Sequence, residues 1–180
     1  MNHSHHDTMN HDSMDHSAMV KPSTSTQQIL TWSEFVDKNG PINEDTILFV
    51  PAGTTLVFDN GSSDTPIAIG GMVIEGGVAF EDGVDANYDV SADFILAHNG
   101  GSFEIGSDEE PFKGEVTISL TADEDQEFDL TSSNVNVVSA GDPIMPEHAA
   151  MLEKMIGDGN NNFVMGMGDG SSIQIIADDE

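Results

Sequence analysis

The sequence contains no cysteine and no arginine, and only four of its 180 residues are basic. Without cysteine the chain forms no disulfide and offers no thiolate for catalysis or for a metal. Without clustered basic residues it cannot neutralise a phosphate backbone, which excludes nucleic-acid binding as a main activity. No apolar run approaches the roughly 18 residues that cross a bilayer, so we expect no membrane insertion.

Negative charge, in contrast, is abundant. Acidic residues number 33, which gives a net charge of −29 with neutral histidines. Such a chain repels polyanions, including acidic polysaccharides, unless a divalent cation bridges the two. The acidity suits a salty or calcium-rich exterior. The N-terminus shows neither the cationic segment nor the apolar core of a signal peptide, so either a signal was removed, or export uses another route, or the protein stays inside.

The chain divides into a tail, residues 1–31, and a body, residues 32–180. The tail is polar and has no hydrophobic period, so it cannot bury enough surface to offset the entropy lost on ordering, and we expect it to be disordered. Hydrophobic residues make up 37% of the chain, near the average for globular proteins. The body should therefore form a single core.

Short β-branched and aromatic stretches, separated by Gly, Asn and Asp, predict an all-β body. One helix is expected at about 144–156, between Asp142-Pro143 and Gly157, and a shorter one at 32–38. The expected strands are 46–50, 54–58, 67–74, 78–81, 93–98, 102–105, 115–120, 134–138, 163–167 and 172–176.

Three segments share the order strand, Gly-Gly or Asp-Gly, strand: MVIE-GG-VAF, ILAHN-GG-SFEI and VMGMG-DG-SSIQII. The pairs Gly76-Gly77 and Gly100-Gly101 lie 24 residues apart. This period fits a parallel β-helix, in which each coil buries its inward side chains on the next. The glycines would then provide sharp bends with positive φ. A β-sandwich is the alternative architecture.

Glycines, prolines and aromatic residues also occur in a characteristic order along the body. The order begins with Trp32, Pro41 and Val50-Pro51-Ala52-Gly53 and continues with Asp59, Val73-Ile74-Glu75-Gly76, Phe80, Ala92-Asp93-Phe94-Ile95 and the run GGSFEIGSDEEPFKGEVTISL. Over residues 32–120, about half of the chain, the sequence resembles the G-eight domain, a family named for its eight glycines. Residues 121–180 would add a further β coil and a helix.

The resemblance implies a β-rich extracellular or cell-surface module. Family members occur in large secreted or membrane-anchored proteins, including animal proteins of hyaluronan breakdown and proteins of cilia and hearing. A longer parallel β-helix usually follows the domain in them. No catalytic residue is agreed for the domain alone, so the resemblance assigns none here.

The tail carries the clearest chemical pattern. Three consecutive five-residue units each contain H-x-x-M, and two further histidines precede them, which gives the candidate ligands His3, His5, His6, Met9, His11, Met14, His16 and Met19. Thioether and imidazole together suit Cu(I), and imidazole alone suits Cu(II), Ni(II) or Zn(II). The segment is similar to the His/Met-rich stretches of periplasmic copper-resistance proteins. A solvated leader or a purification tag is the alternative, although a tag would not normally repeat H-x-x-M in register.

The histidine at position 3 adds a second possibility. A free terminal amine, two deprotonated amides and the His3 imidazole form a square-planar set that Cu(II) and Ni(II) prefer. This arrangement requires Met1 to be the unblocked terminus.

Weaker candidates lie in the body. Met145, His148, Met151 and Met155 share the expected helix and could form a second soft-metal site, but core packing is the better interpretation because Ala149, Leu152 and Ile156 extend the same face. His98 is expected to be a turn or surface residue. The acidic runs Asp108-Glu109-Glu110 and Asp123-Glu124-Asp125 with Glu127 could hold Ca²⁺. Neither matches the EF-hand loop or the GGxGxDxUx calcium repeat, and solvated charge explains them better.

No catalytic motif is present, so we expect no enzyme activity from this chain. The sequence predicts an extracellular or surface module that binds a neutral glycan or a protein partner and carries a metal-binding tail. One alternative is a copper- or nickel-handling protein whose tail is the working part. Another is the N-terminal fragment of a larger polysaccharide-active protein.

Overall fold

The computed structural model describes residues 27–62, 65–122, 129–130, 134–138, 144–157 and 163–177. Within them no helix is long and apolar enough to cross a membrane. The helices are α1 (Trp32–Asn39), η1 (Asn60–Ser62, a 3₁₀ turn) and α2 (Pro146–Gly157). The strands are β1 (Gln28–Thr31), β2 (Ile47–Val50), β3 (Thr54–Phe58), β4 (Ile67–Ile69), β5 (Gly71–Ile74), β6 (Gly77–Phe80), β7 (Asn87–Ala92), β8 (Phe94–His98), β9 (Ser102–Ile105), β10 (Glu115–Leu120), β11 (Val135–Val137), β12 (Phe163–Met167) and β13 (Ser172–Ile175).

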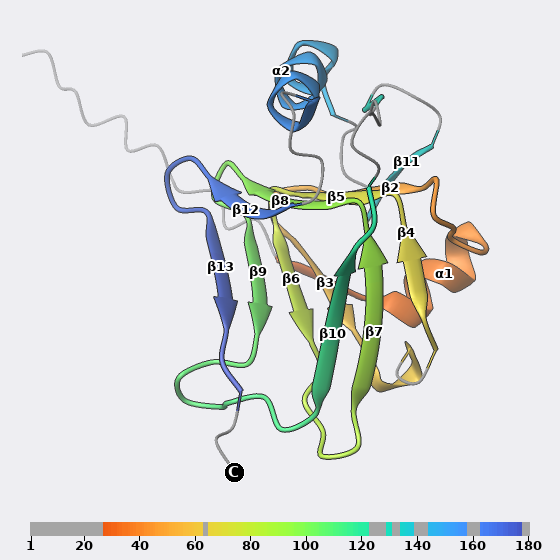
Figure 1. Ribbon diagram of the computed structural model, residues 1–180, viewed down its shortest axis with the longest axis vertical. Coiled ribbons are helices and arrows are strands. Elements are labelled where there is room, and N and C mark those ends of the chain that lie inside the picture. The colour runs from red at the N-terminus through yellow and green to blue at the C-terminus, as the bar shows by residue number, and fades with distance from the viewer. Residues whose placement is uncertain are drawn as a thin grey trace, which may run out of the picture.

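The strands form three parallel sheets (Figure 1). Sheet A has the order β1-β3-β6-β9-β13, sheet B the order β11-β2-β5-β8-β12, and sheet C the order β10-β7-β4. The chain visits the sheets in turn, so that Val50 pairs with Ile74, and Ile74 pairs with Ala97. This confirms the predicted parallel β-helix and rules out the β-sandwich, because every named strand pairing in the described residues is parallel.

Aromatic rings are stacked through the interior of the β-helix. Trp32 stacks on Phe58 at 5.2 Å between ring centroids, and Phe58 stacks on Phe80 at 4.8 Å. Phe80 then meets the edge of Phe103 at 5.7 Å. Such ring pairs contribute roughly 0.5–1.5 kcal/mol each beyond the area that they bury. The stack therefore ties α1 and three successive strands of sheet A into one core.

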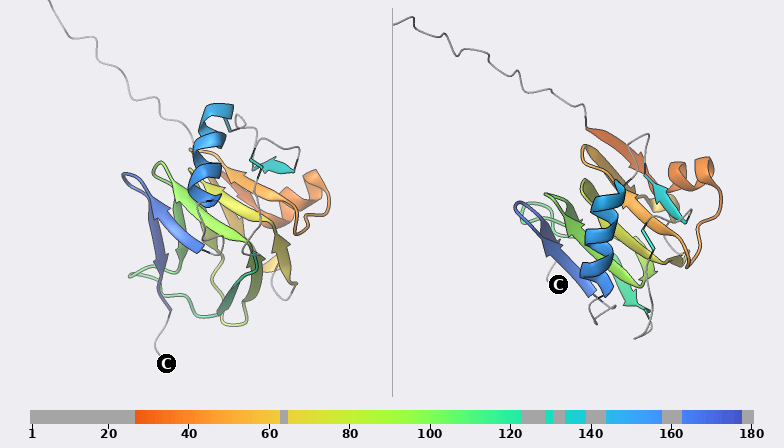
Figure 2. Two further views of the ribbon diagram at one scale, coloured as in Figure 1. Left: turned by 45° about the horizontal axis from the view of Figure 1, so that its top comes forward. Right: turned by 90° about the horizontal axis from the view of Figure 1, so that it is seen from above.

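The central strands of sheet B, β2, β5 and β8, are buried on both faces. The inner face of the sheet belongs to the β-helix interior, and its outer face lies beneath α2 (Figure 1 and Figure 2). The outer cluster comprises Ile47, Phe49, Val73, Phe94, Leu96, Leu130, Ala149, Leu152 and Ile156. Burial on both faces explains why these three strands are nearly continuous apolar runs and not alternating ones.

A long excursion of the chain positions α2. Phe94 of β8 pairs with Phe163 of β12, 69 residues later. Between them the chain supplies β10 to sheet C and then β11, which pairs with β2 toward the opposite edge of sheet B. The helix α2 comes between β11 and β12 in the sequence. It packs on residues of β2, β5 and β8 and so lies across the middle of sheet B.

The structure differs from the sequence prediction in three respects. Gln28–Thr31, placed in the tail, form β1 beside β3. The single strand expected at 67–74 is two strands, β4 and β5, which meet at Gly70. Strand β7 was not predicted at all, because Asn87 and Asp89 are poor strand formers.

The role of the turn glycines also needs correction. Gly100 has the predicted positive φ of 87°, but Gly76 and Gly101 do not. A Cβ at Gly76 would lie 2.1 Å from the carbonyl oxygen of Thr54, and one at Gly101 would lie 1.9 Å from that of Ile74. These two glycines are required because the backbone of the preceding coil passes too close for any side chain.

Candidate metal centre

The candidate site lies at the corner where sheet B turns into sheet A. Glu75 directly follows β5, and His98 is the last residue of β8. Ile74 pairs with Ala97 in the ladder between these strands, so the next residues, Glu75 and His98, stand side by side on consecutive coils. Two residues 23 positions apart in sequence thus become neighbours through one turn of the β-helix.

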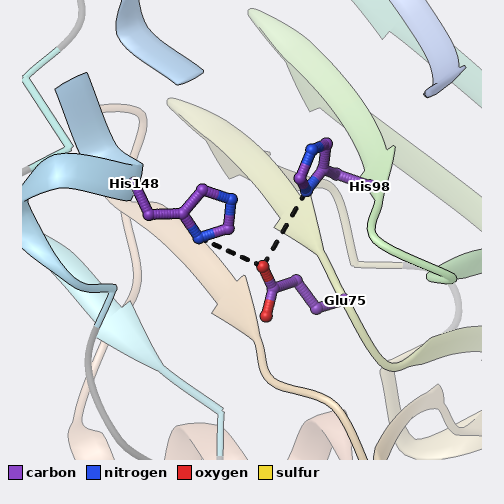
Figure 3. Close-up of side chains that lie close together, drawn as sticks. All are labelled: Glu75, His98 and His148. Atoms are coloured by element: carbon purple, nitrogen blue, oxygen red, sulfur yellow. Dashed lines mark ion pairs between the residues drawn. The ribbon is translucent and has the colours of Figure 1, made fainter. Parts of the chain in front are cut away.

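The third residue, His148, comes from the first turns of α2. The helix buries Ala149, Leu152 and Ile156 on the outer cluster, and this packing turns His148 toward the corner. Figure 3 shows the two imidazoles and the carboxylate converging from three separate elements. Nδ1 of His148 lies 3.3 Å from Oε1 of Glu75, and Nδ1 of His98 lies 3.9 Å from the same oxygen.

The three side chains are largely withdrawn from solvent. Their exposed fractions are 12% for Glu75, 16% for His98 and 26% for His148. Among the described residues, Oε1 of Glu75 and Nδ1 of His98 are buried without a hydrogen-bond partner. A buried polar atom without a partner costs about 1–3 kcal/mol, and more when it is charged, so an ion or a water bound between these two atoms would be stabilising.

The spacing of these atoms fits a metal ion. One ligand atom from each residue can be chosen so that all three lie within 4.8 Å of one another. Nitrogen and oxygen ligands about 2.1 Å from a tetrahedral ion lie roughly 3.4 Å apart, close to the observed 3.3 and 3.9 Å. Small rotations of the side chains would complete the approach.

The donor set favours transition metals over alkaline-earth ions. Two imidazoles and one carboxylate suit Zn²⁺, Cu²⁺ or Ni²⁺, whereas Ca²⁺ takes six to eight oxygens. Three protein ligands leave a fourth position for a further donor or for solvent. The net charge of −29 also raises the local concentration of cations around the molecule.

The two imidazoles also contact each other. The ring centroids of His98 and His148 lie 5.0 Å apart, with the planes inclined by 51°. An ion bound by one nitrogen of each ring would link the two imidazoles and account for their close approach.

The site differs from the sequence prediction. The eight tail ligands, His3, His5, His6, Met9, His11, Met14, His16 and Met19, lie outside the described residues. Of the expected helical group, Ala149, Leu152 and Ile156 pack in the core as interpreted, but Met145 and Met151 are exposed and not core residues. The side chain of Met155 lies outside the described part.

Of the other weak candidates, Asp108-Glu109-Glu110 form an exposed turn, and Asp123-Glu124-Asp125 with Glu127 are outside the described residues. In the turn, the backbone N–H of Glu110 donates to Oγ of Ser107 at 3.0 Å. His98 is not the turn or surface residue that was expected. Glu75 was missed altogether, although the 23-residue step from Glu75 to His98 lies close to the detected period of 24.

The chain matches the model of a known family. The family model for the G8 domain, the G-eight family of the sequence resemblance, matches residues 31–141. This is more than half of the chain, so the protein belongs to the G8 domain family. G8 domains are typically extracellular or cell-surface domains. No curated protein and no solved structure matches the chain.

Proposed function

We propose that this protein is an extracellular or cell-surface binding module whose β-helix holds a transition-metal ion at Glu75, His98 and His148. The observation that carries the proposal is that Oε1 of Glu75 and Nδ1 of His98 are buried without a hydrogen-bond partner, 3.9 Å from each other. One ion at this corner would satisfy both and would engage His148 as well. It would also join α2 to the coil corner by coordinate bonds.

The test measures metal binding by the full-length protein in a background where the tail cannot compete. The tail-substituted protein keeps its length but carries Ala at His3, His5, His6, His11 and His16 and Leu at Met9, Met14 and Met19. Titration calorimetry with Zn²⁺, Cu²⁺ and Ni²⁺ should give one bound ion per chain for at least one of these metals. Glu75→Gln should weaken that affinity by at least about 100-fold, since the ligand loses its charge.

Two further variants complete the design. His148→Gln should weaken binding to a similar extent, and Glu109→Gln, which removes the same charge from an exposed turn, should leave it unchanged. Circular dichroism of each variant shows whether it has folded. Binding that is absent from the folded parent, or equally strong in folded Glu75→Gln, would refute the proposal.

The tail is proposed as a second, separate metal-binding segment. Its three H-x-x-M units support Cu(I) or Cu(II) binding, with Ni(II) as the alternative at His3. Elemental analysis for copper, nickel and calcium should find more copper on the intact protein than on the tail-substituted protein after equal loading and desalting. Equal metal contents would make the tail a leader or linker. A protein that handles copper or nickel through its tail should lose that role on substitution.

A neutral glycan or a protein partner remains the proposed ligand of the body. A cavity of about 350 Å³ beside α1 supports this proposal, with apolar walls from Trp32, Val36 and Ile42 and polar groups from Ser33 and Asp37. Trp32 is the single tryptophan, so its fluorescence reports on this cavity directly. Titration with neutral oligosaccharides should shift that emission, and a panel without any shift would leave a protein partner as the candidate.

A further inference from the structure

The neighbour of His98 on its other side is a methionine. Strand β12 pairs with β8 so that Met167 stands directly opposite His98. Paired residues on adjacent strands of a sheet lie about 4.8 Å apart and point to the same face. Glu75, His98 and Met167 are therefore neighbours on three consecutive coils at this corner.

The side chain of Met167 belongs to the outer face of sheet B, where α2 lies. Phe163 and Met165 alternate with Met167 along β12 and are paired with Phe94 and Leu96, two members of the outer cluster. Met167 is itself partly buried against this cluster. Its thioether is thus on the same face of the sheet as the two imidazoles.

We propose that Met167 supplies the fourth ligand of the metal centre and that the centre is therefore a copper site with a preference for Cu(I). This rests on the metal-binding function proposed above for Glu75, His98 and His148. Thioether sulfur is a soft ligand that selects Cu(I), whereas Zn²⁺ is bound through imidazole, carboxylate and thiolate. In a protein without cysteine, methionine is the soft donor that the chain has for copper.

Met151 is the competing candidate for the fourth position. It lies one turn after His148 on α2, but its side chain is 44% exposed. Nothing in the described part of the fold holds this exposed side chain toward the imidazoles. The strand pairing, in contrast, places Met167 beside His98. The register therefore favours Met167.

The chain offers a matched control on the same strand. Met165 lies two residues before Met167, on the same face, but it stands opposite Leu96 and not His98. Met167→Leu and Met165→Leu make the same chemical change at equivalent backbone positions. Only the first should affect the metal centre.

The experiment uses the tail-substituted, full-length protein. Cu(I) affinity is measured by competition with a chromophoric Cu(I) chelator, and Zn²⁺ affinity by competition with a fluorescent zinc indicator. Met167→Leu should weaken Cu(I) binding by at least about tenfold and change Zn²⁺ binding by less than about twofold. Met165→Leu and Met151→Leu should change neither. In X-ray absorption of the Cu(I) form, the sulfur scatterer should disappear in Met167→Leu alone.

The outcomes separate the two proposals. If Glu75→Gln abolishes metal binding but Met167→Leu leaves Cu(I) affinity and the sulfur signal intact, the metal centre stands and the role of Met167 is refuted. If Met151→Leu weakens Cu(I) binding instead, the fourth ligand is on α2, and the role of Met167 is likewise refuted. If Glu75→Gln also has no effect, the metal centre itself is refuted.

Discussion

Glu153 on α2 accepts a hydrogen bond from the backbone N–H of Leu130 at 2.7 Å, across 23 residues of sequence. The side chain of Leu130 in turn packs in the outer cluster with Leu152. The helix is therefore held both by apolar burial and by a polar contact that involve no ligand. The fold itself therefore positions His148 at the corner, which would lower the cost of assembling the proposed metal site.

Metal binding should slow amide hydrogen exchange in α2. Opening of the helix must release His148 from the ion, so at a free metal concentration about 100 times the dissociation constant the opening becomes about 100-fold rarer. Exchange followed by mass spectrometry should show this slowing in peptides from 146–157, with little change in β6. If the metal slows exchange equally in α2 and β6, or in neither, it does not join α2 to the corner.

Leu152→Ala should undock α2. The side chain is fully buried in the outer cluster, and its truncation should lower the free energy of unfolding by about 2–5 kcal/mol in urea titrations. Met151→Ala, the adjacent and partly exposed position, should change it by less than about 0.5 kcal/mol. Because His148 moves with the helix, Leu152→Ala should also weaken metal binding. A stable variant with full metal affinity would show that α2 does not depend on this face.

Gly101→Ala should destabilise the β-helix, because the new methyl group would lie 1.9 Å from the carbonyl oxygen of Ile74. Displacing a neighbouring coil costs about 1–3 kcal/mol or more. Gly83→Ala is the control, since its methyl group would meet no atom closer than 3.6 Å and its φ is not positive. We expect its urea midpoint to be unchanged or slightly higher. Similar losses in both variants would argue against the close approach of the coils.

Tyr88 should titrate far above the ordinary range of tyrosine. Burial, reinforced by the carboxylates of Glu81, Asp59 and Asp82, raises the pKa of Tyr88 to about 12. Its hydroxyl donates to the carbonyl oxygen of Glu81 at 3.0 Å. Because the folded pKa exceeds the unfolded value of about 10, Tyr88 contributes its full stabilisation below pH 10 and loses it as the pH rises toward 12.

The measurement for Tyr88 is unambiguous, since the chain has a single tyrosine. Absorbance of the phenolate should rise near pH 12 in the folded protein and near pH 10 in denaturant. Folded protein that titrates near pH 10 would show that the side chain is accessible to water. Tyr88→Phe removes the signal and identifies it.

The strands that consist of apolar, β-branched runs could be predicted from the sequence. Strands such as β2 and β8 were predicted because burial on both faces leaves a continuous apolar stretch. Strand β7 was missed because sheet C has one solvated face, so Asp89 and Ser91 interrupt its run. The short β1 was missed because Gln28–Thr31 follow a long polar segment, and their pairing with β3 and the packing of Leu30 on the core are not visible in the sequence.

The candidate site was less predictable than the fold. Glu75 and His98 lie one coil apart, so the glycine period could have brought them together had the register been fixed to a single residue. His148 could not be placed in this way. Its position depends on which strand follows α2 and on which face of sheet B the helix covers, and no local sequence pattern encodes either.

The long excursion between β8 and β12 sets an order of assembly. Coils linked by about 24 residues make contacts that are local in sequence and close quickly, whereas the contacts of β11 with β2 and of β12 with β8 close large loops and form late. On a ribosome, Glu75 and His98 would already face each other before His148 had been synthesised. An ion captured early by the half-formed pair would then act as a template for the docking of α2, and metal supply would influence the speed of folding as well as the final stability.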